Sequence, residues 1–164
     1  MNIDDIAAFV FDFDGVLTNN RVYLNQDGIE TVACSRADGL AFDVLRKLNK
    51  PAFILSTEKN SVVTMRAKKL KIKAIQGISN KVTALLSLIE TNCLNIEEVL
   101  YVGNDLNDYR VMQLCGFTAC PADSHEKIKE ISTFILKSNG GNGVVRELIE
   151  QVMDIDIVEI MYTE

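Results

Sequence analysis

Phe9-Val10-Phe11-Asp12-Phe13-Asp14-Gly15-Val16-Leu17-Thr18 is the stretch on which the fold and the site of this 164-residue chain depend. The apolar run from Ile6 to Phe11 predicts a buried strand. Because residues i and i+2 of a strand point to the same side, Asp12 and Asp14 can reach one spot beyond its end, where open α/β sheets bind ligands. Two carboxylates so close repel each other unless a proton or a cation accompanies them. The pair therefore indicates a cation site or, as the simpler alternative, a solvated acidic turn.

Composition and charge restrict the class of protein. The length suffices for one domain with a hydrophobic core, and 48% hydrophobic with 24% charged residues is typical of a globular protein. The net charge of −6 argues against a nucleic-acid partner, and an anionic substrate would need a locally recruited cation. The N-terminal segment does not resemble a signal peptide and no apolar run has the length of a membrane span, so we expect no membrane partner.

The four cysteines lack the paired spacing of metal-binding motifs: they are Cys34, Cys93, Cys115 and Cys120. Together with the single His125 they form a poor zinc set. We expect them to be reduced in a cytoplasmic protein and to serve mostly as small core residues, with His125 at the surface start of a helix.

Buried strands alternate with amphipathic helices along the rest of the chain. Further strands are predicted at 52–55, 73–75, 99–102, 117–119 and 133–136, with helices over about 40–48, 62–70, 82–91, from 108 to 115, and 144–152. Asp38 is expected to cap the first helix. The alternation predicts an α/β fold, a Rossmann-like parallel sheet with helices on both faces.

Three further segments interrupt or extend this pattern, within what we expect to be a single domain over residues 1–164. Asn25-Gln26-Asp27-Gly28 is a turn signal that predicts a β-hairpin inserted after the first strand, over about 19–35. Gly140-Gly141-Asn142-Gly143 opens the last helix and is expected to approach the substrate or a neighbouring subunit. The tail, 153–164, is partly apolar and can fold over the core or pack on another subunit.

Polar side chains follow four predicted strands, and these ends lie along one edge of a parallel sheet. They are Asp12 with Asp14, Ser56 with Thr57, Lys81, and Asn104 with Asp105 and Asp108. The set suits phosphoryl transfer to a carboxylate, in which Mg²⁺ neutralises the reacting anions through hard oxygen ligands. An ammonium and a hydroxyl can hold the remaining phosphoryl oxygens, and a second acid can protonate the leaving alcohol.

On these residues the chain resembles the phosphatases of the haloacid dehalogenase superfamily. The four motifs stand in order as Asp12-Phe13-Asp14-Gly15-Val16-Leu17-Thr18, Ser56, Lys81, and Gly103-Asn104-Asp105-Leu106-Asn107-Asp108. The resemblance implies that Asp12 is a nucleophile forming an aspartyl-phosphate, that Asp14 is general acid and then base, and that Ser56 and Lys81 bind the phosphoryl group. It also implies a Mg²⁺ site from Asp12, Asp14, Asn104, Asp105 and Asp108.

Within the superfamily the chain is similar to the 3-deoxy-octulosonate 8-phosphate phosphatases and their sialic-acid-type 9-phosphate relatives, over nearly its whole length. The matching pieces are 14–18, 36–39, 76–81 and 140–147. The likeness implies a phosphorylated 3-deoxy-2-ulosonic acid as substrate, no large cap domain, and a homotetramer in which the hairpin and a neighbour's C-terminal segment close the site. The residues expected around the substrate are Arg36, Gly39, Thr57, Glu58, Arg66 and Asn107.

The chain departs from the family pattern in its last motif. Gly103-Asn104-Asp105 stands where the family has Gly-Asp-Asp, so either Asn104 ligates Mg²⁺ through its carbonyl oxygen or Asp105 shifts into that position. We favour Asn104, with Asp105 and Asp108 in support. Asn104 is also the feature that favours a non-catalytic module of the kind fused to cytidylyltransferases.

The substrate is less defined than the reaction class. Ser56-Thr57-Glu58 replaces Thr-Gly-Arg or Thr-Gly-Glu, and its glutamate resembles the nine-carbon branch of the family. Arg66 lies on an exposed helix face or contacts a substrate carboxylate, and Arg36 is a surface charge or a substrate clamp. A phosphatase for another small sugar phosphate is the alternative within the class.

Overall fold

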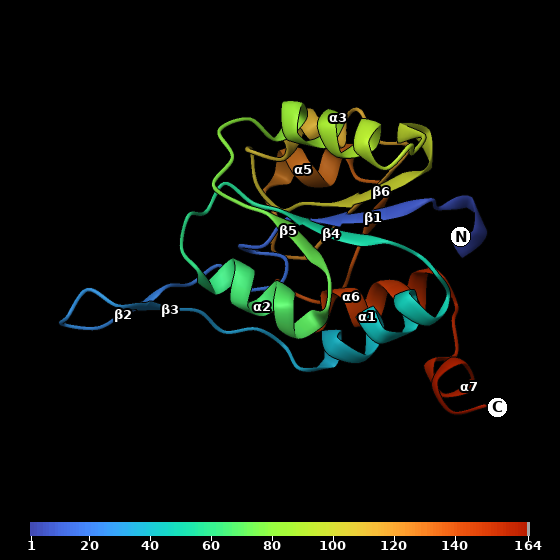
Figure 1. The fold of residues 1–164 in the computed structure, drawn as a ribbon, viewed down its shortest axis with the longest axis horizontal. Coiled ribbons are helices and arrows are strands. Elements are labelled where there is room, and N and C mark those ends of the chain that lie inside the picture. Colours follow the sequence, from blue (N-terminus) through green and yellow to red (C-terminus); the bar gives the residue numbers. More distant parts are fainter. Residues whose placement is uncertain (164) are drawn as a thin grey trace.

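Six parallel strands form the central sheet of the computed structural model, which describes residues 1–163. In the order β5-β4-β1-β6-β7-β8 they are β5 (Lys73–Ile75), β4 (Ala52–Leu55), β1 (Ala8–Phe11), β6 (Val99–Val102), β7 (Phe117–Cys120) and β8 (Phe134–Ile135). The chain first builds outward from β1 through β4 to β5, then crosses over and continues on the other side with β6 (Figure 1). The predicted Rossmann-like α/β fold is confirmed, with its reversal of strand order beside β1.

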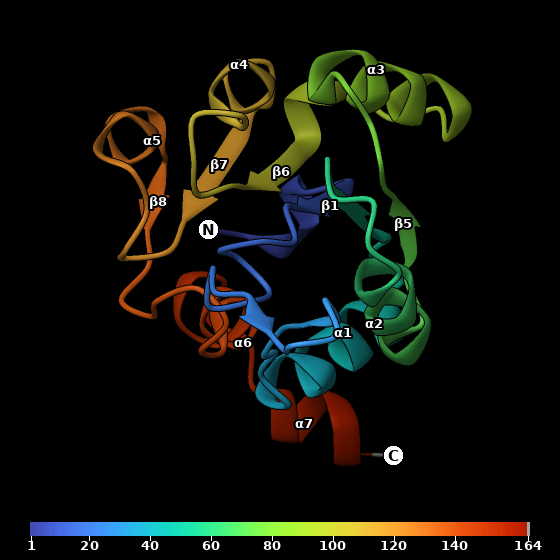
Figure 2. The same cartoon turned by 90° about the vertical axis from the view of Figure 1, so that its left-hand side faces the viewer.

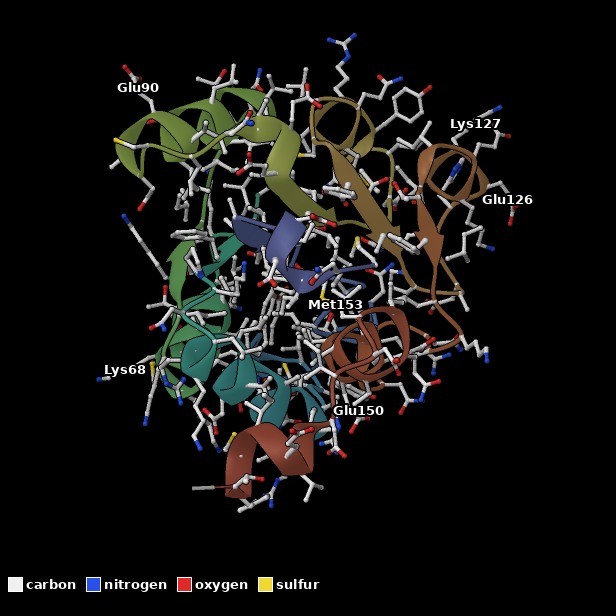
Figure 3. All side chains as sticks on the ribbon, turned by 90° about the vertical axis from the view of Figure 1, so that its right-hand side faces the viewer. Lys68, Glu90, Glu126, Lys127, Glu150 and Met153 are labelled. Atoms are coloured by element: carbon white, nitrogen blue, oxygen red, sulfur yellow. The ribbon has the colours of Figure 1, made fainter. Side chains whose placement is uncertain are left out.

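Helices cover both faces of the sheet, as Figure 2 shows. On one face lie α1 (Ala37–Lys47), α2 (Val62–Leu70) and α6 (Val144–Glu147), and on the other α3 (Lys81–Thr91), α4 (Tyr109–Met112) and α5 (Glu126–Ile131). Period-two alternation along β1 sends Phe9 and Phe11 into the first layer and Ala8 and Val10 into the second. Side chains fill both layers, while charged groups point outward from the helices (Figure 3). The central strand is therefore buried on both faces.

Predicted helix ends differ from the observed ends in the second half of the chain. The helix after β6 ends at Met112, before Cys115. The predicted helix 144–152 is α6 followed by a π-helical segment, η3 (Leu148–Val152). Two short 3₁₀ turns, η1 (Ile3–Asp5) and η2 (Ile96–Glu98), precede β1 and β6.

Asp38 caps a helix other than its own, so the prediction that it caps α1 is wrong. It lies in the first turn of α1, and its Oδ1 accepts hydrogen bonds from the backbone N–H groups of Val145 (2.9 Å) and Arg146 (3.2 Å). These donors begin α6, more than 100 positions later, where local sequence signals cannot reveal them. Asp38 therefore ties α1 to the C-terminal part of the first layer.

The predicted hairpin is formed by β2 (Tyr23–Leu24) and β3 (Glu30–Thr31), which pair antiparallel apart from the main sheet. It extends away from the body of the molecule (Figure 1). Its base is held by a bridge between Thr18 and Cys34. Four large apolar residues of the hairpin are exposed: Val22, Tyr23, Leu24 and Ile29.

The C-terminal tail folds over its own chain as α7 (Ile157–Tyr162), which packs on α1. The Nζ of Lys47 donates hydrogen bonds to the carbonyls of Ile160 (3.1 Å) and Met161 (2.9 Å). Glu164, the last residue of the predicted tail, lies outside the described residues. Between Met1 and Thr163, the structure contains no helix with the length and apolar character of a membrane span.

The four cysteines are free. Cys120 is a buried core residue as expected, whereas Cys93 is exposed and Cys34 and Cys115 are partly buried. His125 caps α5 at the surface, where its Nδ1 accepts the N–H of Lys127, as the sequence predicts.

Replacing Asp38 with alanine should lower the free energy of unfolding by about 1–3 kcal/mol, because the buried N–H of Val145 and the partly buried N–H of Arg146 lose their acceptor. Asp38→Asn keeps the accepting oxygen and should lose less. Urea denaturation at pH 7 measures both, with Asp43→Ala on the same helix as the control. An Asp38→Ala protein no less stable than Asp43→Ala would contradict the role of this contact.

Candidate active site

Two neighbouring strand ends, those of β1 and β6, meet at a hollow of about 230 Å³ where the strand order reverses. Asp12 follows β1 and Asn104 follows β6. The other lining residues are Asp14, Asn20, Thr57, Asp105, Leu106 and Asn107. We call this set the main hollow. A larger groove of about 540 Å³ at the amino edge of the sheet has no carboxylate or hydroxyl side chain in its lining, so it lacks the groups for phosphoryl chemistry.

The loop after β1 is held in a tight turn that only glycine permits at one position. Gly15 has φ of +81°, and a Cβ there would lie 1.9 Å from Nδ2 of Asn104. The N–H of Gly15 donates to Oγ1 of Thr18 (3.2 Å), and the N–H of Phe13 donates to Oδ1 of Asp12 (2.8 Å). These contacts fix the Asp12 carboxylate and bring Asn104 against the same loop.

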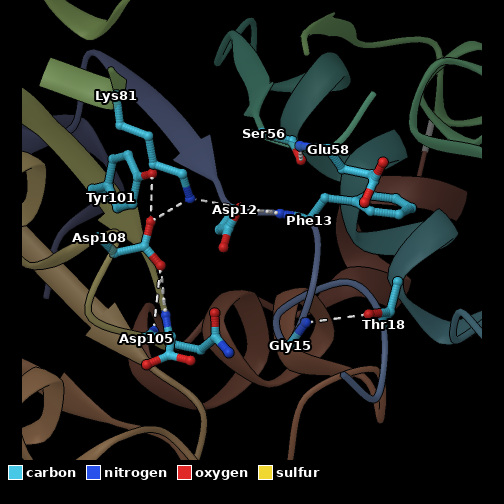
Figure 4. Close-up of polar contacts among 11 residues, drawn as sticks. Asp12, Phe13, Gly15, Thr18, Ser56, Glu58, Lys81, Tyr101, Asp105 and Asp108 are labelled. Carbon is cyan, nitrogen blue, oxygen red and sulfur yellow. Dashed lines mark hydrogen bonds and ion pairs between the residues drawn. The ribbon is translucent and has the colours of Figure 1, made fainter. Parts of the chain in front are cut away.

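A buried cluster of charges lies directly behind Asp12 (Figure 4). The ammonium Nζ of Lys81, at the start of α3, is 2.7 Å from Oδ1 of Asp12 and 2.6 Å from Oδ1 of Asp108. The hydroxyl of Tyr101, in β6, donates to the same oxygen of Asp108 (2.9 Å). All four side chains are buried, so each charge depends on its partners rather than on water.

Asp108 is surrounded by protein donors, which favours a positioning role over metal binding. Its second oxygen, Oδ2, accepts the backbone N–H groups of Asn104 (3.0 Å) and Asp105 (3.4 Å). A Cβ on Gly103 would come within 2.7 Å of this side chain, so glycine is needed there too. Asp108 is absent from the lining of the main hollow. It holds the loop that presents Asn104.

The pKa shifts show which groups gain from a cation. Burial, followed by the negative charge of Asp108, raises the pKa of Asp12 although Lys81 opposes the shift. Burial would lower the pKa of Lys81, but the charges of Asp12 and Asp108 together raise it, so the ammonium stays protonated. Burial and then the nearby Glu58 raise the pKa of Asp14. Carboxyl groups therefore outnumber cations in this region, and Asp12 and Asp14 keep their protons more tightly than free carboxyl groups unless a further cation binds.

The residues of the main hollow fit a magnesium ion. Oδ1 of Asn104 is buried and has no hydrogen-bond partner within residues 1–163, which leaves a neutral oxygen free for a ligand. Asp12 and Asp14 add two carboxylates. Within the described part of the chain, no three or more His, Cys, Asp and Glu side chains are placed to hold a metal, so the amide oxygen of Asn104 is needed beside the two carboxylates. A small number of oxygen ligands from the protein suits Mg²⁺, because this ion keeps several water molecules among its ligands.

Ser56 and the residues after it lie at the end of β4. Oγ of Ser56 accepts the N–H of Glu58 (3.1 Å), which leaves its own hydrogen free to donate, but Ser56 is buried and does not line the main hollow. Its neighbour Thr57 does. Oε1 of Glu58 accepts the N–H groups of Lys59 (2.6 Å) and Asn60 (2.7 Å), so this carboxylate is held in place.

The structure does not bring the other predicted substrate residues to Asp12 within one chain. Arg36, Gly39 and Arg66 line a separate hollow of about 350 Å³ on α1 and α2 that shares no residue with the main hollow. Nη2 of Arg66 donates to the carbonyl of Ser35 (2.6 Å) at the base of the hairpin. Arg66 thus holds the hairpin in this chain.

Two features of the site escaped the sequence analysis. The sequence predicts Tyr101 as a core residue because it lies in a continuous apolar run. Its role in the site is visible only from the hydrogen bond of its hydroxyl to Asp108. Gly140 and Gly141 approach the catalytic loop of their own chain: the N–H of Gly141 donates to the carbonyl of Val16 (2.9 Å), and a Cβ on Gly140 would lie 2.2 Å from the carbonyl oxygen of Gly15. The sequence predicts a close approach of this glycine run to the substrate or to a neighbouring subunit, whereas the structure shows a close approach to the loop of its own chain.

Known proteins resemble this chain in sequence and in fold. Residues 45–148 match the family described as haloacid dehalogenase-like hydrolase. The 3-deoxy-D-manno-octulosonate 8-phosphate phosphatase of Salmonella typhi is 31% identical over 151 residues, which cover 92% of this chain and 80% of that protein.

Solved structures agree with the sequence matches. A HAD-family hydrolase from Streptomyces avermitilis superposes with a TM-score of 0.89 at 41% identity, over 92% of this chain and 86% of that one. The 3-deoxy-D-manno-octulosonate 8-phosphate phosphatase of Moraxella catarrhalis was solved with magnesium, phosphate and KDO (3-deoxy-D-manno-octulosonate). It superposes with a TM-score of 0.87 at 31% identity, over 96% of this chain and 88% of that one.

The fold, the strand-end carboxylates and these matches place the chain among the haloacid dehalogenase-like hydrolases. Its enzymatic class is phosphatase.

Replacing Lys81 with methionine should lower the free energy of unfolding by about 3–5 kcal/mol at pH 7 in EDTA, because two buried carboxylates lose their cation. Guanidinium denaturation measures the loss. Adding Asp108→Asn to Lys81→Met should restore part of it, since one uncompensated charge disappears. Lys127→Met, which removes an exposed ion pair with Glu130, is the control and should leave stability nearly unchanged. Equal stability of the two lysine variants would show that the buried cluster contributes nothing.

Proposed function

We propose that the chain is a Mg²⁺-dependent phosphomonoesterase that removes the terminal phosphate of a 3-deoxy-2-ulosonic acid of eight or nine carbons through an aspartyl-phosphate on Asp12. The observation that carries the proposal is the contact of Asp12 with the buried ammonium of Lys81, beside a hollow that offers Asp14 and the unpartnered oxygen of Asn104. A nucleophilic carboxylate needs such neutralisation before an anionic phosphate can approach.

The chain's own residues supply the steps. An oxygen of Asp12 attacks phosphorus, the bond from phosphorus to the ester oxygen breaks, and Asp14 gives its proton to the leaving alkoxide. Asp14 then removes a proton from a water, whose oxygen attacks phosphorus and releases Asp12 and inorganic phosphate. The raised pKa of Asp14 supports its role as the acid.

The phosphoryl group needs contacts that persist through both steps. Lys81 and the free hydrogen of Ser56 are the donors we assign to its oxygens. Bound between Asp12, Asp14 and Asn104, with Asp105 nearby, Mg²⁺ would neutralise the phosphoryl charge. Asp108 and Tyr101 position Lys81 and the Asn104 loop rather than touch the substrate.

The substrate class comes from the relatives. The Salmonella typhi and Moraxella catarrhalis proteins are named for 3-deoxy-D-manno-octulosonate 8-phosphate, and the latter was solved with the dephosphorylated sugar acid. Glu58 supports extending the class to nine-carbon acids. The exposed apolar hairpin supports a homotetramer in which the hairpin meets a second copy.

Asp12→Asn should abolish phosphate release, with a loss of at least about a thousandfold in kcat, because an amide cannot serve as the nucleophile. A colorimetric phosphate assay on the eight- and nine-carbon acid phosphates with Mg²⁺ measures this, and EDTA should stop the wild-type reaction. Asp5→Asn, an exposed aspartate at the opposite edge of the sheet, should behave as wild type. Full activity of Asp12→Asn with Mg²⁺ would exclude the covalent route.

Glu58→Arg should shift the preference toward the eight-carbon acid, because it reverses the charge held beside Asp14. The ratio of kcat/KM for the two acid phosphates is the measurement, and Glu58→Gln separates loss of the negative charge from gain of a positive one. We expect a change of about tenfold in the ratio. An unchanged ratio in Glu58→Arg counts against a specificity role for this position.

A further inference from the structure

The groove at the amino edge of the sheet has no part in the proposed phosphatase site. It measures about 540 Å³, within the range of about 300–1,000 Å³ that is usual for small-molecule sites. Its lining and that of the main hollow have no described residue in common. We call it the amino-edge groove, and its lining comprises Phe42, Leu45, Arg46, Asn49, Lys50, Pro51, Ala52, Phe53, Lys71, Ile72 and Lys73.

Apolar side chains from three elements form the walls of the amino-edge groove. α1 contributes Phe42 and Leu45, the start of β4 contributes Pro51, Ala52 and Phe53, and Ile72 comes directly before β5. Some of these residues are fully buried in the core, whereas Pro51 is exposed. The hydrophobic core therefore reaches the surface here, and an apolar body bound in the groove would be removed from water.

The charged residues of the groove are all basic. Arg46, Lys50, Lys71 and Lys73 line it and no carboxylate from residues 1–163 does, although the whole chain has a net charge of −6. Two of the four have partners, since Arg46 forms an ion pair within α1 and Nζ of Lys50 donates to the carbonyl of Ile6 (2.9 Å). Because positive charge gathers here against the overall balance, the groove attracts an anion.

Lys71 and Lys73 remain for a ligand. Both are exposed, and their ammonium groups take part in no hydrogen bond or ion pair with any residue from 1 to 163. A single lysine on an edge strand is ordinary, because it discourages pairing with another chain. Here a second unpartnered lysine lines the same apolar groove. Two such ammonium groups can bind a carboxylate, sulfonate or phosphate group through charge-assisted hydrogen bonds.

The backbone of Lys71 supports a role for its side chain. Lys71 follows α2 with φ of +58° and ψ of 39°, the left-handed conformation that glycine adopts without steric cost. Its N–H donates to the carbonyls of Ala67 and Lys68, and a glycine would keep this cap. A cation also favours a helix C-terminus, but Lys68 and Lys69 already lie in the last turn of α2. The helix end thus gives no reason for a lysine at this position, whereas the groove does.

We propose that the amino-edge groove binds a small amphipathic anion, whose apolar body lies against Pro51 and Ile72 and whose acidic group is bound by Lys71 and Lys73. The proposal goes beyond the proposed phosphatase function and does not depend on it, because the groove lies at the amino ends of β4 and β5 and the main hollow at the carboxyl ends of the strands.

Two probes that differ only in charge test the proposal. The dye 8-anilinonaphthalene-1-sulfonate (ANS) has an apolar body and a sulfonate, and N-phenyl-1-naphthylamine is the same body without the sulfonate. Fluorescence titration of the wild type should show ANS binding at least about tenfold more tightly than the neutral probe. Equal affinities would overturn the proposal, because the groove would then not select an anion.

Substitution of the two lysines tests whether the dye binds in the groove. Lys71→Gly removes one charge and suits the left-handed backbone, so this variant should unfold at no lower a urea concentration than the wild type. Lys73→Gln removes the other charge. Each should weaken ANS binding about threefold to tenfold and leave the affinity for the neutral probe within twofold, and the double variant should lose most of the preference for ANS.

Lys68→Gln is the matched control, because it removes an exposed lysine of α2 that does not line the groove. Its affinity for ANS should equal that of the wild type. ANS bound to the exposed apolar residues of the hairpin would respond to none of these substitutions. An affinity for ANS in the double variant within twofold of the wild type would therefore overturn the proposal.

Sedimentation separates a small-molecule site from an interface between copies of the chain. The wild type and the double variant should have the same mass in solution, with and without ANS. A lower mass of the double variant would show that the groove holds a second copy of the chain, and it would overturn the small-molecule site.

Discussion

The ammonium of Lys81 between two buried carboxylates is the interaction on which the rest of the site depends. A buried lysine keeps its positive charge only when negative charges lie beside it. Here two carboxyl groups, those of Asp12 and Asp108, face one ammonium. The excess negative charge keeps the lysine protonated and leaves Asp12 short of positive charge. A cation on the open side of Asp12 completes the balance. The three charges thus stabilise one another in the interior, while Asp12 also lines the main hollow.

The parallel sheet makes this charge cluster possible. Each charged group follows or supports a different strand, and the reversal of strand order beside β1 leaves room between the loops after β1 and β6. Asp108 then acts in two directions at once. One oxygen faces Lys81 and Tyr101, while the other holds the backbone of Asn104 and Asp105. The position of Asn104 is therefore linked to the position of the Lys81 ammonium through the side chain of Asp108.

The sequence predicts what is periodic or local in this molecule. Alternating strands and helices, the Asn-Gln-Asp-Gly hairpin turn and the polar residues after strands are all visible in the chain, and they determine the fold and most of the site. The sequence does not predict contacts between residues that lie far apart in the chain. Asp38 looks like a cap for its own helix because its partners at the start of α6 lie far along the chain.

The missed parts of the site have the same origin. The ring of Tyr101 lies in the hydrophobic core, so the sequence predicts a core residue. Its hydroxyl finds a hydrogen-bond acceptor only when the fold brings Asp108 beside it. Arg36 and Arg66 line a hollow apart from Asp12 within one chain, so contact of these two residues with a substrate stays a prediction.

The contact of Gly140 and Gly141 with the loop around Gly15 has a consequence for biosynthesis. The loop after Asp12 is made first, and the backbone that supports it is made more than a hundred residues later. A nascent chain can pair β1 with β4 and build half of the sheet, yet the loop after β1 stays without that support until the glycine run has left the ribosome. The final shape of the loop around Gly15 is therefore a late event of synthesis.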